Sequence, residues 1–121
     1  MQYLLLIYQA EELWENMSSS EKESVMARHM QLHERMEQDG VEWVGQPLMP
    51  TSTSVSVRSL GSEQVVSDGP FAETKEQLAG FYMVDVADVS QAVALASLLQ
   101  EAELGTVEVR PVADHSANLP K

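Results

Sequence analysis

Apolar residues are concentrated in two dense runs of the chain, at residues 3–8 and 80–86. A continuous apolar run of this length is typical of a β-strand that is covered on both faces. Apolar and polar residues alternate instead at residues 53–59 and 106–112. This alternation predicts two further strands, each with one buried and one exposed face.

A hairpin and a weaker extended segment complete the predicted strands. The sequence LGSE turns the chain back into QVVS, which predicts a hairpin in which Val55 and Val57 point inward. Residues 41–50 form a short extended segment. Gly45 and Pro47 interrupt it and disfavour a central position in a sheet.

Two helices are predicted from their start signals. Ser20 and Glu23 have the spacing of a capping box, and Gly40 supplies the left-handed residue that ends a helix. Asp88 caps the second helix, with Gln91 three residues later. The inner face of the first helix comprises Val25, Met26, His29, Leu32, His33 and Met36, and that of the second comprises Ala92, Leu95, Ala96 and Leu99.

The order of elements predicts the fold class. Without the inserted hairpin, the chain has the order βαββαβ, which is the ferredoxin-like split βαβ arrangement of the α+β class. We expect one domain at residues 1–113 and a polar tail at residues 114–121. In this fold two helices cover one face of the sheet. Because the dense strand runs are apolar on both sides, we expect a homodimer that buries the second face.

Composition excludes several classes of function. The chain of 121 residues has 7 basic and 19 acidic residues, a net charge of −12, and no basic cluster, so we expect no nucleic-acid partner. It has no cysteine, which excludes disulfides, thiol nucleophiles and cysteine zinc sites. No run approaches the roughly 20 apolar residues of a membrane span, and the amino-terminal run lacks the basic residues of a signal peptide. We therefore expect no membrane partner and a cytoplasmic location.

The segment VVSDGPFAETKEQLAGF, residues 65–81, is the first candidate site. Asp68 opens a turn in which Pro70 lacks the N–H that an aspartate usually bonds, so its carboxylate is free for another partner. A solvated turn with Phe71 as a buried anchor is the alternative interpretation. We expect the segment to fold inward and line a cleft. Its candidate ligand-binding residues are Asp68, Gly69, Pro70, Phe71, Glu73 and Lys75, with Glu73 able to join Asp68 around a cation and Lys75 able to pair on the surface.

The second candidate site is the pair His29 and His33, four residues apart on one helix face. Imidazole titrates near neutral pH, and a nearby carboxylate would suit it to acid–base catalysis. Two alternatives stay open: a polar histidine bonded to backbone or water, and a zinc site. The protease zinc motif has Glu after its first histidine, where this chain has Met30. We expect no metal and no cofactor.

The long block DGPFAETKEQLAGF, followed by GTVEVRPV and preceded by QDGVEWVGQPLMP, resembles the YCII-related proteins of the DGPF type. The resemblance spans nearly the whole chain. It implies a ferredoxin-like fold assembled as a dimeric α/β barrel, and a gene neighbourhood with sigma factors of the extracytoplasmic-function class. In the wider group, a His–Asp pair has been proposed as catalytic, and one branch dehalogenates an aromatic ring intermediate.

The His–Asp pair carries over only in part. Its histidine corresponds to His29 or His33. Its aspartate lies after the second helix, where this chain reads QEAELGT, with Glu101 and Glu103 and no aspartate. Asp68, from a different loop, is therefore the preferred acid of a pair with either histidine.

Two functional hypotheses remain. The first, slightly favoured, is a non-catalytic dimer that binds a small molecule or a partner protein, with a link to sigma-factor regulation. The second is a small-molecule hydrolase or lyase in which His29 or His33 acts as general base with Asp68. The distance between histidine and carboxylate distinguishes them, because a hydrogen-bonded pair in a cleft favours the enzyme.

Overall fold

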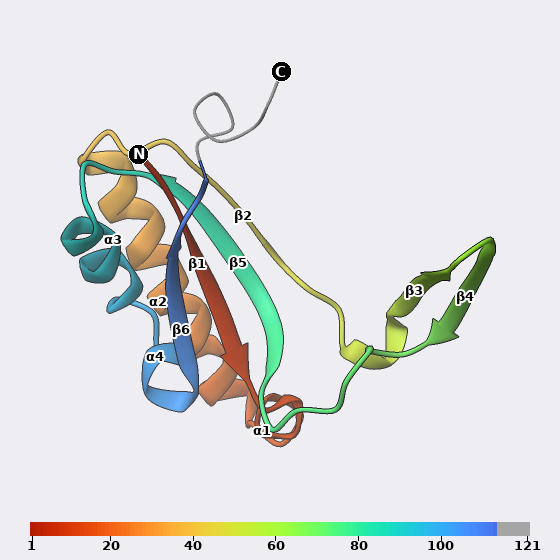
Figure 1. Cartoon of the computed structure of the whole chain (residues 1–121). Helices are drawn as coiled ribbons and strands as arrows, with labels where there is room; N and C mark the ends of the chain where they lie inside the picture. The colour runs from red at the N-terminus through yellow and green to blue at the C-terminus, as the bar shows by residue number, and fades with distance from the viewer. Residues whose placement is uncertain (114–121) are drawn as a thin grey trace.

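A four-stranded antiparallel sheet forms the centre of the protein (Figure 1). The computed structural model describes residues 1–113, so the predicted tail at 114–121 lies outside the described residues. The strands are β1 (Gln2–Gln9), β2 (Trp43–Pro47), β5 (Gln77–Asp85) and β6 (Thr106–Pro111), in the order β2-β5-β1-β6. This order is compatible with a ferredoxin-like fold and confirms the α+β class.

The helices lie on one face of this sheet (Figure 1). They are α1 (Glu11–Glu15), α2 (Ser19–Gln38), α3 (Val89–Ala96) and α4 (Glu101–Leu104). The predicted cap of α3 is confirmed, since Asp88 accepts a hydrogen bond from the amide of Gln91 at 3.0 Å. None of the helices within residues 1–113 is long and apolar enough to span a membrane.

The start of α2 was predicted two residues too late. The capping box is formed by Ser18 and Glu21, not by Ser20 and Glu23. Ser18 has the extended backbone that a capping residue needs, with φ −69° and ψ 164°, whereas Ser20 already lies within the helix. The predicted end is confirmed, because Gly40 follows α2 with a φ of 67°.

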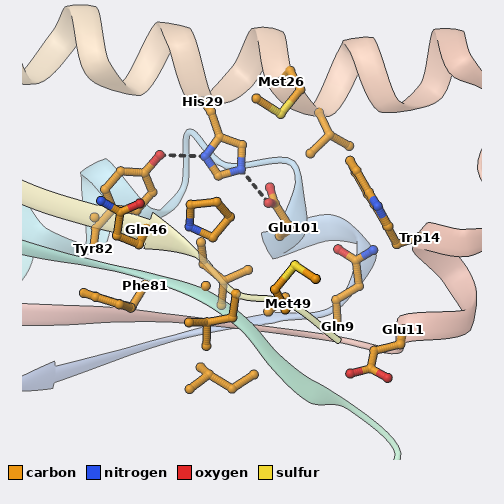
Figure 2. Close-up of a pocket in the computed structure, with 18 of the residues that line it drawn as sticks. Gln9, Glu11, Trp14, Met26, His29, Gln46, Met49, Phe81, Tyr82 and Glu101 are labelled. Carbon is orange, nitrogen blue, oxygen red and sulfur yellow. Dashed lines mark hydrogen bonds and ion pairs between the residues drawn. The ribbon is translucent and has the colours of Figure 1, made fainter. Parts of the chain in front are cut away.

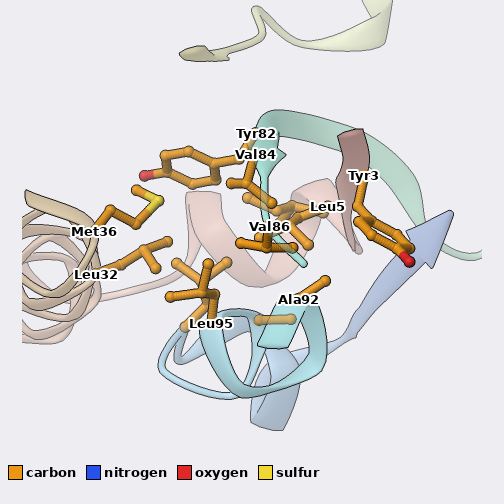
Figure 3. Close-up of a cluster of buried hydrophobic side chains, with 12 residues drawn as sticks. Tyr3, Leu5, Leu32, Met36, Tyr82, Val84, Val86, Ala92 and Leu95 are labelled. Atoms are coloured by element: carbon orange, nitrogen blue, oxygen red, sulfur yellow. The ribbon is translucent and has the colours of Figure 1, made fainter. Parts of the chain in front are cut away.

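The core lies between this sheet and α2 and α3 (Figure 3). Residues alternate along β1, so that one set of side chains is buried under the helices and the other is only half-buried. Within one chain the helices thus cover one face of the dense strands, and the burial of the second face by another copy stays a prediction. The largest fully buried side chains of the core are Leu5, Leu32, Met36, Val84 and Leu99.

The hairpin forms a separate two-stranded ribbon of β3 (Val55–Leu60) and β4 (Glu63–Asp68), which follows the short 3-10 helix η1 (Thr51–Thr53). Figure 1 shows this ribbon standing apart from the central sheet. Val55 and Val57, which were predicted to point inward, are more than half exposed. The reason is that the ribbon packs on neither helix nor sheet, so neither of its faces is covered.

Candidate functional site

A cavity of about 410 Å³ lies between α2 and one end of the central sheet (Figure 2). Its walls come from β1, β2, β5, α1, α2 and the start of α4, and from the loop that leads from β2 to η1. Most of the lining residues are apolar or aromatic, including Trp14, Trp43 and Phe81. A concave, mainly apolar cavity with a few polar groups is the usual form of a small-molecule site.

Four polar side chains form a continuous chain of hydrogen bonds at the wall of this cavity. His29 Nε2 lies 2.5 Å from Glu101 Oε2, and His29 Nδ1 lies 2.6 Å from the Tyr82 hydroxyl (Figure 2). The same hydroxyl lies 2.9 Å from His33 Nε2. Tyr82 therefore connects the two histidines, and Glu101 ends the chain on the buried side.

Each member is placed by a simple local rule. His29 and His33 lie one turn apart on the inner face of α2. Tyr82 pairs with Leu5 across β5 and β1, and both side chains point toward the helices. Glu101 is the first residue of α4 and is only 6% exposed.

Tyr82 is held in place from the neighbouring strand. Gly45 of β2 lies opposite Tyr82 in β5. A Cβ atom on Gly45 would lie 2.6 Å from Tyr82 Cδ1, so only glycine leaves room for the ring. Trp43, also in β2, stacks on the ring of His33 with ring centroids 4.5 Å apart. The strand β2 thus holds the rings of both Tyr82 and His33 in position.

Burial sets the protonation of Tyr82 and His33. Burial, and then the negative charge of Glu101, raise the pKa of Tyr82 to about 12, so its hydroxyl keeps its proton at neutral pH. Burial also lowers the pKa of His33, and the neighbouring His29 lowers it further, while Glu37 opposes the shift. His33 is therefore biased toward its neutral form.

These protonation states give the hydrogen bonds a direction. The direction also depends on the other two members: with an ionised Glu101 beside a neutral His29, His29 Nε2–H donates to the carboxylate and Nδ1 is left as an acceptor. The single proton of the Tyr82 hydroxyl then goes to His29 Nδ1, and its oxygen accepts from His33 Nε2–H. Every donor in the chain points toward Glu101.

The DGPF segment does not reach this site within one chain. Asp68 ends β4 in an exposed position, and Phe71 is 82% exposed. The expectation that the segment folds inward with Phe71 as an anchor is thus wrong for the single chain. The backbone explains the placement, because the Gly69 amide donates to Ser54 O at 2.7 Å and ties the segment to the ribbon.

The remaining DGPF candidates lie in the same outer region. Gly69 has a φ of 89°, Pro70 follows it, and Glu73 and Lys75 are exposed. None of these residues lines the cavity. Their role in binding stays a prediction, as does a catalytic role for Asp68. Within residues 1–113, no three His, Asp or Glu side chains are grouped as a metal site would require.

Sequence reasoning found both histidines but set aside their partner. Glu101 was noted as a departure from the aspartate of the related proteins, and the structure places it in hydrogen-bond contact with His29. Tyr82 and Gln9, which also line the cavity, were missed. The available signal was their place in apolar strands, where a polar group needs a partner.

The whole described chain corresponds to one known domain type. The family model described as the YCII-related domain matches residues 1–116. The chain belongs to the YCII-related domain family. A curated relative is an uncharacterized protein of Rhizobium meliloti (strain 1021), which is 37% identical over 115 residues that make up 93% of each chain. The family resemblance inferred from the DGPF block is confirmed.

Proposed function

We propose that the protein binds a small, largely apolar molecule in this cavity and that the His29–Glu101 pair transfers a proton on it. The observation that supports this proposal is the 2.5 Å contact of His29 Nε2 with Glu101 Oε2 at the cavity wall. This contact meets the criterion that favours the enzyme over the non-catalytic binder. Glu101 takes the role that the sequence assigned to Asp68.

The surroundings of the pair suit proton transfer. His29 has a side chain only 16% exposed, so its charge changes in a largely dry environment. When the imidazole gains a proton, the positive charge forms beside the Glu101 carboxylate, which stabilises it. The base on His29 is Nδ1, which becomes available to the bound molecule when the Tyr82 hydroxyl turns from it toward His33 Nε2; this turn requires His33 to carry its proton on Nδ1.

The walls restrict the class of ligand. The apolar lining favours a hydrophobic body, and Glu11, Glu15 and Glu101 on the lining disfavour an anionic one. A volume of about 410 Å³ lies within the range of small-molecule sites, roughly 300–1,000 Å³. A compact, uncharged compound is therefore the proposed substrate class.

Proton transfer can be tested without knowing the natural substrate. Cyclohexanone and 2-indanone carry exchangeable C–H bonds beside a carbonyl, and their deuteration in D₂O is followed by NMR. The wild-type protein should accelerate exchange, and His29→Gln should lower the acceleration by roughly 10²-fold or more. Glu103→Gln, on the same short helix but outside the cavity, is the matched control. The proposal fails if neither compound perturbs the NMR signals of the cavity residues, or if His29→Gln exchanges them as fast as the wild type.

We also propose that two copies of the chain associate through the sheet face opposite the helices. Leu4, Leu6 and Met83 lie on that face in neighbouring strands, where β1 and β5 pair Leu4 with Met83. These side chains are only half-buried, and a contiguous apolar face of this kind is costly in water. The β3–β4 ribbon adds exposed Val57 and Val66, and an isolated two-stranded ribbon is only marginally stable.

A second copy of the chain is the proposed partner because a sheet face matches its own copy in shape and polarity. Such an arrangement is a dimeric α/β barrel, and it would place the DGPF residues Asp68, Phe71 and Glu73 against the partner. Sedimentation at micromolar concentration should give twice the mass of the chain, and Leu6→Glu should give the monomer. A monomeric wild type would contradict the proposal. A cytoplasmic location and the link to sigma-factor regulation stay predictions from the sequence and its family resemblance.

A further inference from the structure

The cavity contains two buried polar atoms that the hydrogen-bond chain does not use. Among the described residues, Gln9 Nε2 and Glu101 Oε1 are buried and have no hydrogen-bond partner. Gln9 is only 4% exposed and Glu101 only 6%. Buried polar atoms in folded proteins nearly always have a partner, so two unpaired ones in one cavity call for a physical reason.

Both side chains belong to the same part of the cavity. Gln9 ends β1 on the helix-facing side, and Figure 2 shows its side chain rising between Glu101 and Trp14. The helix that carries Glu101 is pressed against this end of β1. A Cβ atom on Gly105, which follows α4, would lie 3.2 Å from the Gln9 Cα. The unpaired donor and the unpaired acceptor thus come from two directly contacting elements.

The other buried or half-buried polar side chains of the cavity wall, those of His29, His33, Tyr82 and Glu11, already have partners, whereas Gln46 and Glu15 lie in its exposed rim. Both nitrogens of His29 and the hydroxyl of Tyr82 have partners. A ligand that leaves these bonds in place can still pair with Gln9 Nε2 and Glu101 Oε1, provided that the two side chains turn these covered atoms toward the cavity. The first donates a hydrogen bond and the second accepts one.

We propose that Gln9 and Glu101 select a ligand that carries a neutral hydroxyl group on an apolar body. This inference rests on the proposed function and names the polar group of its substrate. A hydroxyl oxygen accepts from Gln9 Nε2–H, and its own proton goes to Glu101 Oε1, so one atom satisfies both residues. A ketone or ether leaves Glu101 unpaired, an ammonium leaves Gln9 unpaired, and a carboxylate is repelled by Glu101.

Selectivity follows from the cost of leaving these atoms unpaired. A site built to hydrogen-bond a hydroxyl group discriminates strongly against the analogue that lacks it. Gln9 is a specificity residue in this scheme, because it contacts the ligand without exchanging a proton. It was absent from the candidates predicted by sequence because it ends an apolar strand.

The test uses the full-length ¹⁵N-labelled chain and four probes with the same six-membered ring: cyclohexanol, cyclohexanone, cyclohexylamine and cyclohexanecarboxamide. Dissociation constants are measured by NMR titration, with the Gln9 side-chain amide as the local signal. Cyclohexanol should bind roughly tenfold or more tightly than cyclohexanone and cyclohexylamine, as the loss of one hydrogen bond predicts. Cyclohexanecarboxamide carries its donor and acceptor on different atoms and should bind more weakly than cyclohexanol.

Gln9→Met keeps the length of the side chain and removes the amide. It should abolish the preference for cyclohexanol and raise the melting temperature, because it replaces an unpaired buried polar group with an apolar one. Gln9→Leu should do the same, and Gln38→Met, at the exposed end of α2, should change neither property.

Three results would overturn the inference: no preference in the wild type, a preference that survives in Gln9→Met and Gln9→Leu, or a lower melting temperature in both variants. The two proposals fail separately. Binding of all probes without preference removes the hydroxyl assignment and leaves proton transfer standing. A preference for cyclohexanol without any deuterium exchange of ketones removes proton transfer and leaves the hydroxyl assignment standing.

Discussion

Replacing Glu101 with glutamine should lower the pKa of Tyr82. The pKa of this phenol is raised from 10.0 to about 12 by burial first and by the charge of Glu101 second. The total rise is 12 − 10.0, or about 2, and burial is the larger cause. Removing the charge should therefore lower the pKa of Tyr82 only by the smaller share of that rise and leave it above its ordinary value.

The same variant should destabilise the fold moderately. Glutamine keeps the shape of the side chain but turns a charge-assisted hydrogen bond into a neutral one. Hydrogen bonds to charged groups contribute about 1.5–3 kcal/mol, so the free energy of unfolding should fall by no more than that. The prediction is checked by urea unfolding and by NMR titration of the Tyr82 ring carbon, with circular dichroism confirming the fold at each pH.

Glu103→Gln provides the comparison that makes the result specific. Glu103 lies two residues further along α4, its side chain is 66% exposed, and its contact with Arg28 is 3.7 Å. An exposed pair of this kind contributes at most about 1 kcal/mol. An unchanged pKa of Tyr82 in Glu101→Gln would refute the reasoning, and so would an equal change in Glu103→Gln.

Three further predictions follow from the same geometry. The free energy of unfolding should fall less steeply below pH about 6.5 in His33→Gln than in the wild type. The reason is that the pKa of His33 is lowered in the folded chain, so the unfolded chain takes up this proton first as the pH falls. An unchanged slope in pH-dependent urea unfolding would contradict this. Gly45→Ala should lower the free energy of unfolding by about 1–3 kcal/mol and weaken the hydrogen bonds of Tyr82, since its Cβ would lie 2.6 Å from the ring. Urea unfolding measures the first effect and the histidine NMR signals the second. An unchanged free energy of unfolding would mean that the strands separate without cost. Phe71→Ser should change the unfolding free energy of the single chain by less than about 0.5 kcal/mol, because the side chain is 82% exposed; a loss typical of a core residue, at a concentration where sedimentation shows a monomer, would place Phe71 inside.

The elements that the sequence predicted correctly are those with a long or distinctive pattern. The apolar stripe of α3 and the alternating pattern of the hairpin can be recognised in the sequence, and both elements exist in the structure. The start of α2 is less well defined, since Ser18, Ser19 and Ser20 can all act as caps and only the backbone conformation selects among them. The short helices α1 and α4 lack room for an apolar stripe and leave no periodic signal.

The site was predictable only where its residues share one element. His29 and His33 are four residues apart, so their common face follows from helix geometry alone. Tyr82 and Glu101 join them through strand register and through the packing of α4 on β1, which no local pattern specifies. Asp68 was assigned to the site because Pro70 leaves its carboxylate without the usual local partner, but the ribbon carries it outward.

The chain of hydrogen bonds has a further property that follows from its protons. Tyr82 keeps its proton at neutral pH, so it takes part in proton movement by turning its hydroxyl, without ionising.

The hydrogen bonds can run in two directions. In one state His33 donates to Tyr82 and Tyr82 donates to His29; in the other His29 donates to Tyr82 and Tyr82 donates to His33. The second state requires a doubly protonated His29 and a lone pair on His33 Nε2. The lowered pKa of His33 keeps this ring neutral, and the neutral ring offers Nε2 as an acceptor when its proton lies on Nδ1. A proton gained by His29 beside the buried Glu101 is therefore accommodated by reversing two hydrogen bonds together with a change of the His33 tautomer from Nε2–H to Nδ1–H. Such an arrangement suits a site that takes a proton from a bound molecule and returns it, because neither step requires the cavity to open to water.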